Sequence, residues 1–390
     1  MKTFLALLSA ALIIPATTRP TSAAGEASAT ETAIARVRAV MGEGKGNAEA
    51  ASALKELTSH DASSLLSLLQ AMDGANDLSA NWLRSAIETL AQREGSGGKE
   101  LPLAALGGFL FDTRHDPRAR RLAYDLIAQK NAATATSLLP GMLNDPSLEL
   151  RRDAVQQVID NAVKTQSSQN NLAATLLYQQ AMGFARDIDQ IETISAALKT
   201  LGHPADLPTL FGWVREWKVI GPFDNTKRAG FDQVYPPEQE LNLNAEYPGK
   251  ADKVRWKELT SVDDYGKVDV NQPLGKLKET IAYCYTELRV DKAQSAEIRL
   301  GCKNAWKVWL NGKLLFGRDE YHRGAEIDQY RMPVELQAGK NALLVKLGQN
   351  EQVEDWTTEW EFQLRVTDSL GTPIRPLRVG VPLPSTARVN

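Results

Sequence analysis

The segment from Gly317 to Gly324 gathers charged, aromatic and imidazole side chains within a very short stretch of chain. Its polar members are Arg318, Asp319, Glu320, Tyr321, His322 and Arg323. Proteins bind sugars with aromatic rings that lie against C–H faces and with planar charged groups that bridge neighbouring hydroxyls. Because this segment supplies both kinds of group, we expect it to bind a ligand rather than only to connect two strands.

A purely structural interpretation of the same segment stays open. Its arginines could pair with its own carboxylates and with Asp328, which lies a few residues further on. Charged groups that cluster in sequence often neutralise one another at a surface. Such a set of ion pairs would fix the loop and leave no group for a ligand.

A strand–turn–strand segment precedes this loop and must position it. The sequence VWLNGKLLF places Asn311-Gly312 between two apolar runs, where a two-residue hairpin needs two positive φ angles. Trp306 and Trp309 lie on the first strand and differ in strand parity, so they point to opposite faces of the sheet. Either could be the aromatic platform for a sugar, and we take Trp306 as the candidate.

Motifs for catalysis or metal binding are missing from the sequence. There is no GxSxG elbow, Walker loop, Rossmann glycine fingerprint or Cys-His nucleophile pattern. The four histidines are scattered without the spacing of a transition-metal site. We therefore expect no cofactor and no catalytic residue, with room only for a structural calcium ion near Asp224 or Asp232.

From residue 209 onwards, alternation of apolar and polar residues predicts short strands. The expected strands are VRWKEL, YGKVDV, IAYCYTELRV, AEIRLGC, WKVWLNG, KLLFG, YRMPVEL, NALLVKLGQ and WEFQLRV. In the last of these, Trp360 and Phe362 should point inward, and Gln363 and Arg365 outward. About nine short strands joined by Gly, Pro and Asn turns predict two antiparallel sheets packed as a β-sandwich over residues 209–370.

Two cysteines, Cys284 and Cys302, fall on the inward faces of two of these strands. If the two strands form a direct hairpin around Ala293, the cysteines oppose each other and could be bridged. If the strands lie in opposite sheets, a separation of about 10 Å forbids the bond. The sequence leaves both alternatives open.

The order of the motifs AYCYTELRV, EIRLGCKNAWKVWLNGKLL, LQAGKNALLVKLGQ and WEFQLRV resembles the galactose-binding-like jelly roll. VWLNGK and AGKNALLVK are the most recognisable pieces, and the likeness covers residues 217–368. This fold occurs as sugar-binding domains and carbohydrate-binding modules of secreted bacterial glycosidases. The resemblance therefore implies a jelly-roll sandwich with a carbohydrate ligand.

The first half of the chain is predicted to be helical and repetitive. The segments NWLRSAIETLAQ, ARRLAYDLIAQ and LRRDAVQQVIDN align, and another apolar helical segment precedes each of them. Asp116-Pro117 and Asp145-Pro146 lie in the linkers, where aspartate can cap a helix and proline fits its first turn. Two helices per unit and a period of roughly 30 to 39 residues predict an α-solenoid over residues 25–208.

These helix pairs resemble the HEAT repeat family, and NDPSLELRRDAV is the most specific stretch. The resemblance covers residues 62–162. In that family an aspartate and an arginine brace successive repeats, so it implies structural roles for Asp145 and Arg152. Solenoids of this kind commonly offer a surface to another protein, whereas a spacer that supports the second domain is the alternative.

Both ends of the chain are predicted to lie outside the folded domains. Residues 1–24 read as a secretory signal peptide, with Lys2 before an apolar run and small residues at the cleavage site. The run is shorter than the about 20 residues that span a bilayer. Residues 371–390 are rich in proline and should form a loosely attached tail. We therefore expect an exported protein, periplasmic or extracellular, without a membrane span.

Charge and motifs together narrow the expected function. The formal charge of −3 becomes −5 when the two cations of the signal segment, Lys2 and Arg19, are removed. A negative net charge of this size argues against a nucleic-acid partner. We expect a non-catalytic protein whose sandwich binds carbohydrate while the helical repeats act as scaffold or dock a partner. The alternative is a scaffold that binds another extracytoplasmic protein without a sugar ligand. A hydrolase or lyase acting on polysaccharide is the third, and no carboxylate pair in the sequence selects it.

Overall fold

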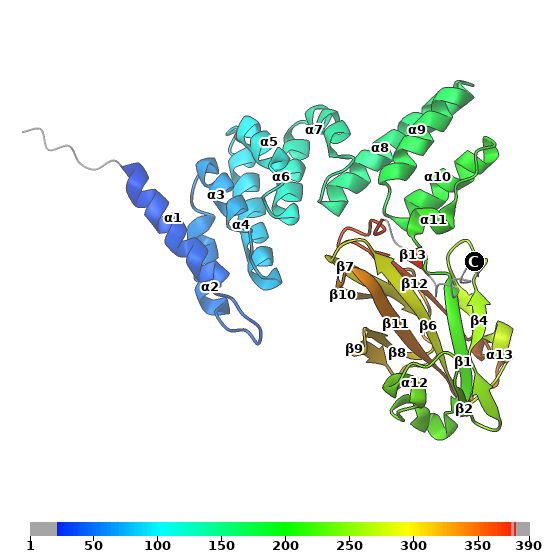
Figure 1. Ribbon diagram of the computed structural model, residues 1–390. Coiled ribbons are helices and arrows are strands. Elements are labelled where there is room, and N and C mark those ends of the chain that lie inside the picture. The colour runs from blue at the N-terminus through cyan, green and yellow to red at the C-terminus, as the bar shows by residue number, and fades with distance from the viewer. Residues whose placement is uncertain (1–21, 376–377, 380–390) are drawn as a thin grey trace, which may run out of the picture. The chain divides into compact units, whose positions relative to one another are not determined.

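The computed structural model describes residues 22–375 and 378–379 (Figure 1). Its contacts divide the chain into two compact units, one ending at Gln157 and the other beginning at Val158. The first unit is helical, and the second contains helices followed by antiparallel sheets. Almost all of the predicted signal peptide, and most of the predicted tail, lie outside the described residues.

Helices of the first unit follow one another with short connections. In chain order they are α1 (Ser22–Arg38), α2 (Asn47–Leu57), η1 (Ala62–Ser64), α3 (Leu65–Gln70), α4 (Asp77–Ser96), α5 (Leu103–Phe111), α6 (Pro117–Lys130), α7 (Ala132–Leu138), η2 (Leu139–Met142) and α8 (Leu148–Ser167), which crosses the division. The predicted capping is confirmed for α6, where the Asp116 carboxylate accepts from the Arg118 N–H at 2.8 Å and Pro117 stands in the first turn.

A buried ion pair links successive helices of this unit. Arg120 of α6 is fully buried, and its Nη1 and Nη2 donate to the Asp145 carboxylate at 2.8 and 2.5 Å. Its Nε donates to the carbonyl of Leu110 in α5 at 2.7 Å. Asp145 therefore has a structural role, with Arg120 as its charged partner.

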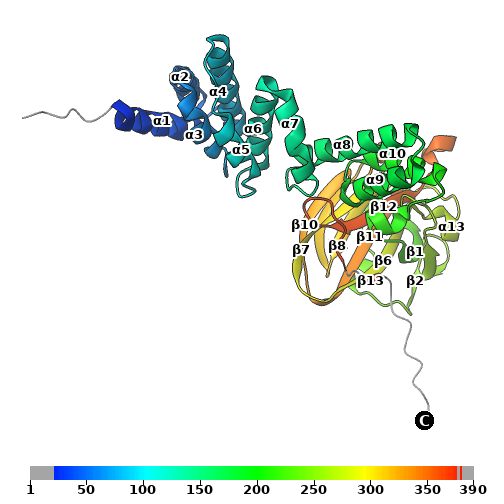
Figure 2. The ribbon, with the colours of Figure 1, turned by 90° about the horizontal axis from the view of Figure 1, so that it is seen from above.

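The second unit begins with the rest of α8 and three further helices. They are α9 (Asn171–Phe184), α10 (Ile188–Thr200) and α11 (Leu207–Phe211). α9 and α10 lie side by side, as Figure 2 shows. α10 has one apolar face, on which Ile191, Ile194 and Leu198 are buried. The boundary between the two compact units, at residue 158, therefore comes earlier in the chain than the change from helices to strands, which follows α11.

Antiparallel strands make up the rest of the second unit. They are β1 (Glu216–Asp224), β2 (Glu246–Pro248), β3 (Lys253–Arg255), β4 (Lys257–Thr260), β5 (Val268–Asp269), β6 (Thr280–Val290), β7 (Gln294–Cys302), β8 (Ala305–Leu310), β9 (Lys313–Arg318), β10 (Tyr330–Leu336), β11 (Gly339–Gln349), β12 (Glu361–Thr367) and β13 (Arg378–Val379). One sheet has the order β4-β1-β6-β11-β8-β9 with β13 beside β6, a second has the order β10-β7-β12-β5, and β2 pairs with β3.

The two larger sheets share one hydrophobic core. Cys284 and Val308 of the first sheet and Ile298 and Leu364 of the second belong to the same buried cluster. We call this arrangement the sandwich. We call the end where β1, β9 and β11 finish and β6, β10 and β12 begin its loop end. Short segments near this end are η3 (Thr226–Phe231), α12 (Pro236–Gln239), α13 (Asn271–Leu274) and η4 (Asp355–Thr357).

The predicted hairpin is confirmed, but one face of the smaller sheet differs from the prediction. Asn311 and Gly312 have φ angles of +52° and +79° between β8 and β9. Gln363 and Arg365 of β12 were predicted to face solvent, yet they are 5% and 4% exposed. Trp213, just after α11, forms a bridge with Arg365, so a connecting segment covers the outer face of this sheet.

Candidate binding site

The loop between β9 and β10, residues 319–329, is fastened to the loop end of the sandwich by two side chains. Asn225 Nδ2, at the end of β1, donates to the Tyr321 hydroxyl oxygen at 3.0 Å. His322 Nε2 lies 2.9 Å from the Asn350 side-chain oxygen, just after β11. Both asparagines are fully buried. The sequence-predicted loop therefore has a defined position against two strands of the larger sheet.

An exposed tryptophan stands beside His322. The Trp356 ring centroid in η4 lies 5.2 Å from that of the imidazole, and the two planes are inclined by 81°. Trp356 is 58% exposed, which is unusual for so large an apolar side chain. The sequence reasoning missed this residue because it lies outside every alternating or helical pattern. Its signal was an aromatic residue in a polar segment between two strands.

The loop arginines are largely open to solvent. Arg318 Nη1 and Arg323 Nε each lie 3.7 Å from a Glu320 carboxylate oxygen, and their side chains are 47% and 69% exposed. A separation of 3.7 Å is too long for a hydrogen bond, although it is short enough for an ion pair. The structural interpretation of the segment is therefore confirmed for Glu320, which faces both arginines, whereas Asp328 pairs with Arg299 and Arg365 instead.

A second arginine–carboxylate pair lies across the loop. Arg228 in η3 holds Glu351 with hydrogen bonds of 2.6 and 3.1 Å, and its guanidinium lies 5.3 Å from the centre of the Tyr321 ring. Burial raises the pKa of Tyr321 to about 12, so its hydroxyl stays neutral at ordinary pH. Burial also raises the pKa of Asp319, and the nearby carboxylate of Asp232 adds to the effect.

Trp306 is not part of this surface. Its side chain is fully buried in the core of the sandwich, where its ring lies 4.8 Å from Tyr330 and 5.9 Å from Phe316. A ring in that position cannot lie against a ligand on the surface. Strand parity placed Trp306 on one face of its strand, and that face turns towards the second sheet. The exposed aromatic residue at the site is Trp356.

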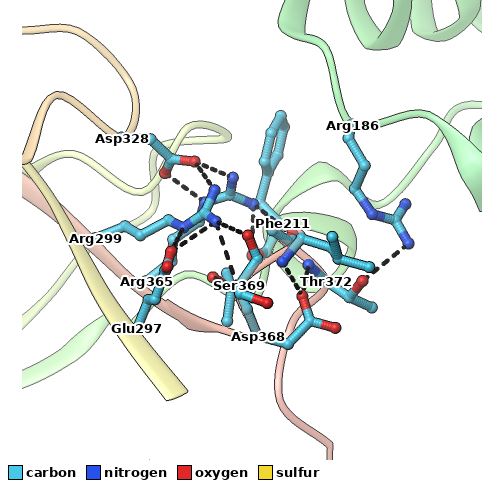
Figure 3. Close-up of polar contacts among 12 residues, drawn as sticks. Arg186, Phe211, Glu297, Arg299, Asp328, Arg365, Asp368, Ser369 and Thr372 are labelled. Carbon is cyan, nitrogen blue, oxygen red and sulfur yellow. Dashed lines mark hydrogen bonds and ion pairs between the residues drawn. The ribbon is translucent and has the colours of Figure 1, made fainter. Parts of the chain in front are cut away.

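The far end of the loop is anchored by a buried group of charges on the smaller sheet (Figure 3). Asp328 Oδ2 lies 2.7 Å from Arg299 Nη1, and its Oδ1 accepts from Arg365 Nε at 2.7 Å. Arg299 also pairs with Glu297 at 2.7 Å. Arg299 and Arg365 are opposite each other in neighbouring strands, and both are almost completely buried.

This charge group connects the loop to the helical segment before β1. Arg365 Nη1 reaches the carbonyl of Phe211, the last residue of α11, at 3.5 Å, and its guanidinium lies 5.4 Å from the centre of the Phe211 ring. Burial acts to raise the pKa of Asp328, but the hydrogen bonds and charges of Arg365 and Arg299 outweigh it and hold the pKa below its usual value. Asp328 is therefore ionised and fixes the loop to two strands and one helix.

A lysine, a glutamate and a tyrosine meet on the other sheet, in a combination that could move protons. The Lys346 ammonium donates to the carbonyls of Phe231 and Gln233 at 2.9 and 2.7 Å and to Glu238 at 2.8 Å. The Tyr283 hydroxyl donates to the same carboxylate. Burial lowers the pKa of Lys346. Because its donors are all used, this group fastens the segment after β1 to β11.

The cysteines are free thiols. Cys284 lies on β6 and Cys302 on β7, and these strands belong to different sheets. Of the two alternatives that the sequence left open, the structure thus shows the one without a disulfide. Burial raises the pKa of Cys302 to about 12, so the thiol is protonated at neutral pH.

The carboxylates named as calcium candidates face cations. Asp224 lies 3.3 Å from Lys250 Nζ, and Asp232 lies 3.2 Å from Lys307 Nζ. In the part of the chain that the structure describes, no three His, Cys, Asp or Glu side chains meet as a set that could hold a metal ion. Asp224 and Asp232 are therefore engaged with lysines at the surface.

Loop residues 318 to 323 thus lie together at the loop end of the sandwich, and Trp356 joins them there. No helix within residues 22–375 is both long and apolar enough to cross a membrane. No protein-family model matches the chain, and no curated protein is significantly similar to it.

Proposed function

We propose that the protein binds carbohydrate through the loop end of its sandwich. The observation that carries the proposal is the exposed indole of Trp356, held beside His322 at the surface. An exposed aromatic ring with planar polar groups around it is the combination that suits a sugar, which has apolar C–H faces and a rim of hydroxyls.

Each side chain has a defined task in this account. The ring of Trp356 lies against one face of a sugar, and the guanidinium groups of Arg318 and Arg323 donate paired hydrogen bonds to adjacent hydroxyls. Tyr321 and His322 are tied to buried asparagines, so they hold the shape of the loop before the ligand arrives. A loop that is already ordered loses less conformational entropy on binding.

The proposal extends to the architecture and location of the chain. A shared core between two antiparallel sheets and a hairpin at Asn311-Gly312 support a galactose-binding-like jelly roll. The buried pair of Arg120 and Asp145 between successive helices supports HEAT-like repeats in an α-solenoid. The predicted signal peptide supports export, and we propose a non-catalytic role for the protein, without a cofactor.

Affinity electrophoresis of the full-length protein through gels that contain single polysaccharides tests the function. We expect at least one polysaccharide to retard the protein, and Trp356→Ala to weaken that retardation about tenfold through loss of the stacking contact. Arg323→Ala should weaken it less, and Val262→Ala, at a position 82% exposed in another loop, should leave it unchanged. The proposal would be refuted if no polysaccharide retards the wild type, or if wild type and Trp356→Ala are retarded equally.

Protein binding is the second candidate function, because α9 exposes two leucines. Leu172 and Leu176 are 75% and 60% exposed and lie one turn apart on the helix. An exposed apolar pair of this kind suits contact with another protein. This function predicts that a Leu172→Lys, Leu176→Lys variant loses a co-purifying protein while its electrophoretic mobility in polysaccharide gels is unaffected.

A further inference from the structure

Two edge strands of the sandwich differ in how they are protected. β9 is the last strand of the larger sheet, and β10 is the last strand of the smaller one. An unprotected edge is a template for pairing with another chain. β10 carries Pro333 at its centre, between the charged side chains of Arg331 and Glu335, and both features discourage pairing. β9 pairs with β8 through a register irregularity between Val308 and Trp309, but it contains no proline and leaves Leu314 and Phe316 at its centre 48% and 44% exposed.

A groove of about 680 Å³ lies against both of these strands. Leu310, Leu315 and Val334 contribute to its apolar lining. The charged residues that line it are three carboxylates and one ammonium: Glu297, Glu335, Asp368 and Lys313. The groove is therefore partly apolar and carries an excess of negative charge. It lies away from the loop end, because the hairpin and the turn after β12 border it.

Two of the carboxylates are not neutralised by a cation. Glu335 accepts a hydrogen bond from Ser295 Oγ at 2.6 Å. Asp368 accepts from the backbone N–H groups of Leu370 and Thr372 at 2.9 and 2.8 Å. Within residues 22–375 and 378–379, neither carboxylate forms an ion pair. Charge complementarity therefore favours an occupant with lysine or arginine side chains.

We propose that an extended, basic segment of a partner protein adds to β9 as a further antiparallel strand and lays its side chains in this groove. Backbone hydrogen bonds to the free edge of β9 provide the register, as in other cases of strand addition. Alternate side chains of the added strand then point to opposite faces of the sheet, so only one set enters the groove. The basic side chains approach Glu335 and Asp368 in the groove, and the apolar ones lie beside the exposed Leu314 on the opposite face.

A second copy of this chain fits the edge less well. If two copies of β9 paired antiparallel and in register, Lys313 of one copy would stand opposite Arg318 of the other. Like charges directly opposite each other destabilise a strand pair. A basic segment in the groove meets one of these two cations, Lys313, but the three carboxylates that line the groove outnumber it.

Fluorescence anisotropy with the full-length protein and labelled model peptides tests the proposal. The probes are a Lys-Val-Lys-Val-Lys-Val peptide, the matching Glu-Val peptide, and a Lys-Val peptide N-methylated at alternate residues to remove backbone donors. We expect only the first to bind. Glu335→Lys should weaken its binding about tenfold by reversing one close charge. Leu314→Lys, which places a charge on the exposed edge, should weaken it by a similar factor.

Val262→Lys is the matched control, because it adds the same charge at an exposed position outside the groove. It should leave peptide binding unchanged, and all three variants should unfold at the temperature of the wild type. The proposal is overturned if no peptide binds, if the Glu-Val or N-methylated peptide binds equally well, or if Leu314→Lys has no effect. Sedimentation that shows a dimer dissociated by Leu314→Lys would overturn it as well, since the occupant would then be a second copy.

Discussion

Replacing Asp328 with asparagine should destabilise the second unit strongly, although it changes only one atom of the side chain. Asp328 has a φ angle of +60°, which asparagine also tolerates, so the substitution introduces no backbone strain. It does remove the negative charge that faces Arg299 and Arg365. It also turns an amide N–H towards groups that are themselves donors.

The size of the effect follows from burial. The side chains of Arg299, Arg365 and Asp328 are 4%, 5% and 9% exposed, so water cannot replace the lost charge. Arg299 keeps Glu297, whereas Arg365 keeps no carboxylate and retains the carbonyls of Phe211 and Gly371, each at 3.5 Å, and the rings of Phe211 and Trp213. Removing one partner of a buried ion pair costs about 3–5 kcal/mol. For a unit of this size, that lowers the melting temperature by roughly 6–20 °C.

Tryptophan fluorescence during thermal unfolding measures this effect selectively. Seven of the eight tryptophans lie after residue 158, so the signal comes mainly from the second unit. Asp319→Asn is the matched control, because Asp319 belongs to the same loop but lies at the surface with its carboxylate only partly desolvated and, among the described residues, forms no ion pair. It should change stability by less than about 0.5 kcal/mol. If Asp328→Asn lowers the melting temperature no more than Asp319→Asn, the reasoning about the charge group is refuted.

Three further predictions concern buried charges. The pKa of Asp328 is lower in the folded protein than the value of about 3.9 in the unfolded chain, so the ionised carboxylate stabilises the fold fully above the unfolded pKa. This stabilisation is lost as pH falls through the folded pKa. The difference in melting temperature between wild type and Asp328→Asn should therefore shrink in acid. Asp145→Asn leaves the fully buried Arg120 without its carboxylate and should destabilise the helical unit by about 3–5 kcal/mol. Urea unfolding followed by far-UV circular dichroism measures this effect. A change below roughly 1 kcal/mol would contradict the bracing role of the pair. Lys346→Met leaves the carboxylate of Glu238 buried without its cation and should lower the free energy of unfolding by roughly 3 kcal/mol. Urea unfolding followed by tryptophan fluorescence measures this, and an unchanged urea midpoint would disprove the prediction.

Local patterns in the sequence predicted much of the fold. YRMPVEL was predicted as one strand, and β10 spans Tyr330–Leu336. Asn311-Gly312 predicted a two-residue hairpin because only residues that tolerate positive φ fit it, and both angles are positive. Asp116-Pro117 predicted the start of α6 for an equally local reason. In each case the deciding interactions lie within a few residues of chain.

Tertiary contacts explain what the sequence patterns did not show. Trp356 lies in a short 3-10 helix without any periodic pattern, so nothing local marked it as exposed beside His322. Alternation told which residues of β12 share a face, but not that other segments cover the outer face and bury Arg365. The partners of Asp328, Arg299 and Arg365, lie 29 and 37 residues away, and the register of β7 and β12 places these two arginines opposite each other.

The ligand-dependent protection of Trp356 tests the proposed sugar site most directly. Acrylamide quenching of tryptophan fluorescence would be measured for the wild type and for Trp356→Phe, each with and without a polysaccharide that retards the wild type in electrophoresis. Trp356 is 58% exposed, so it should account for much of the quenching in the free protein. We predict that the polysaccharide reduces quenching of the wild type and leaves that of Trp356→Phe unchanged. Binding of the polysaccharide without any protection of Trp356 would contradict a carbohydrate site at the loop end of the sandwich.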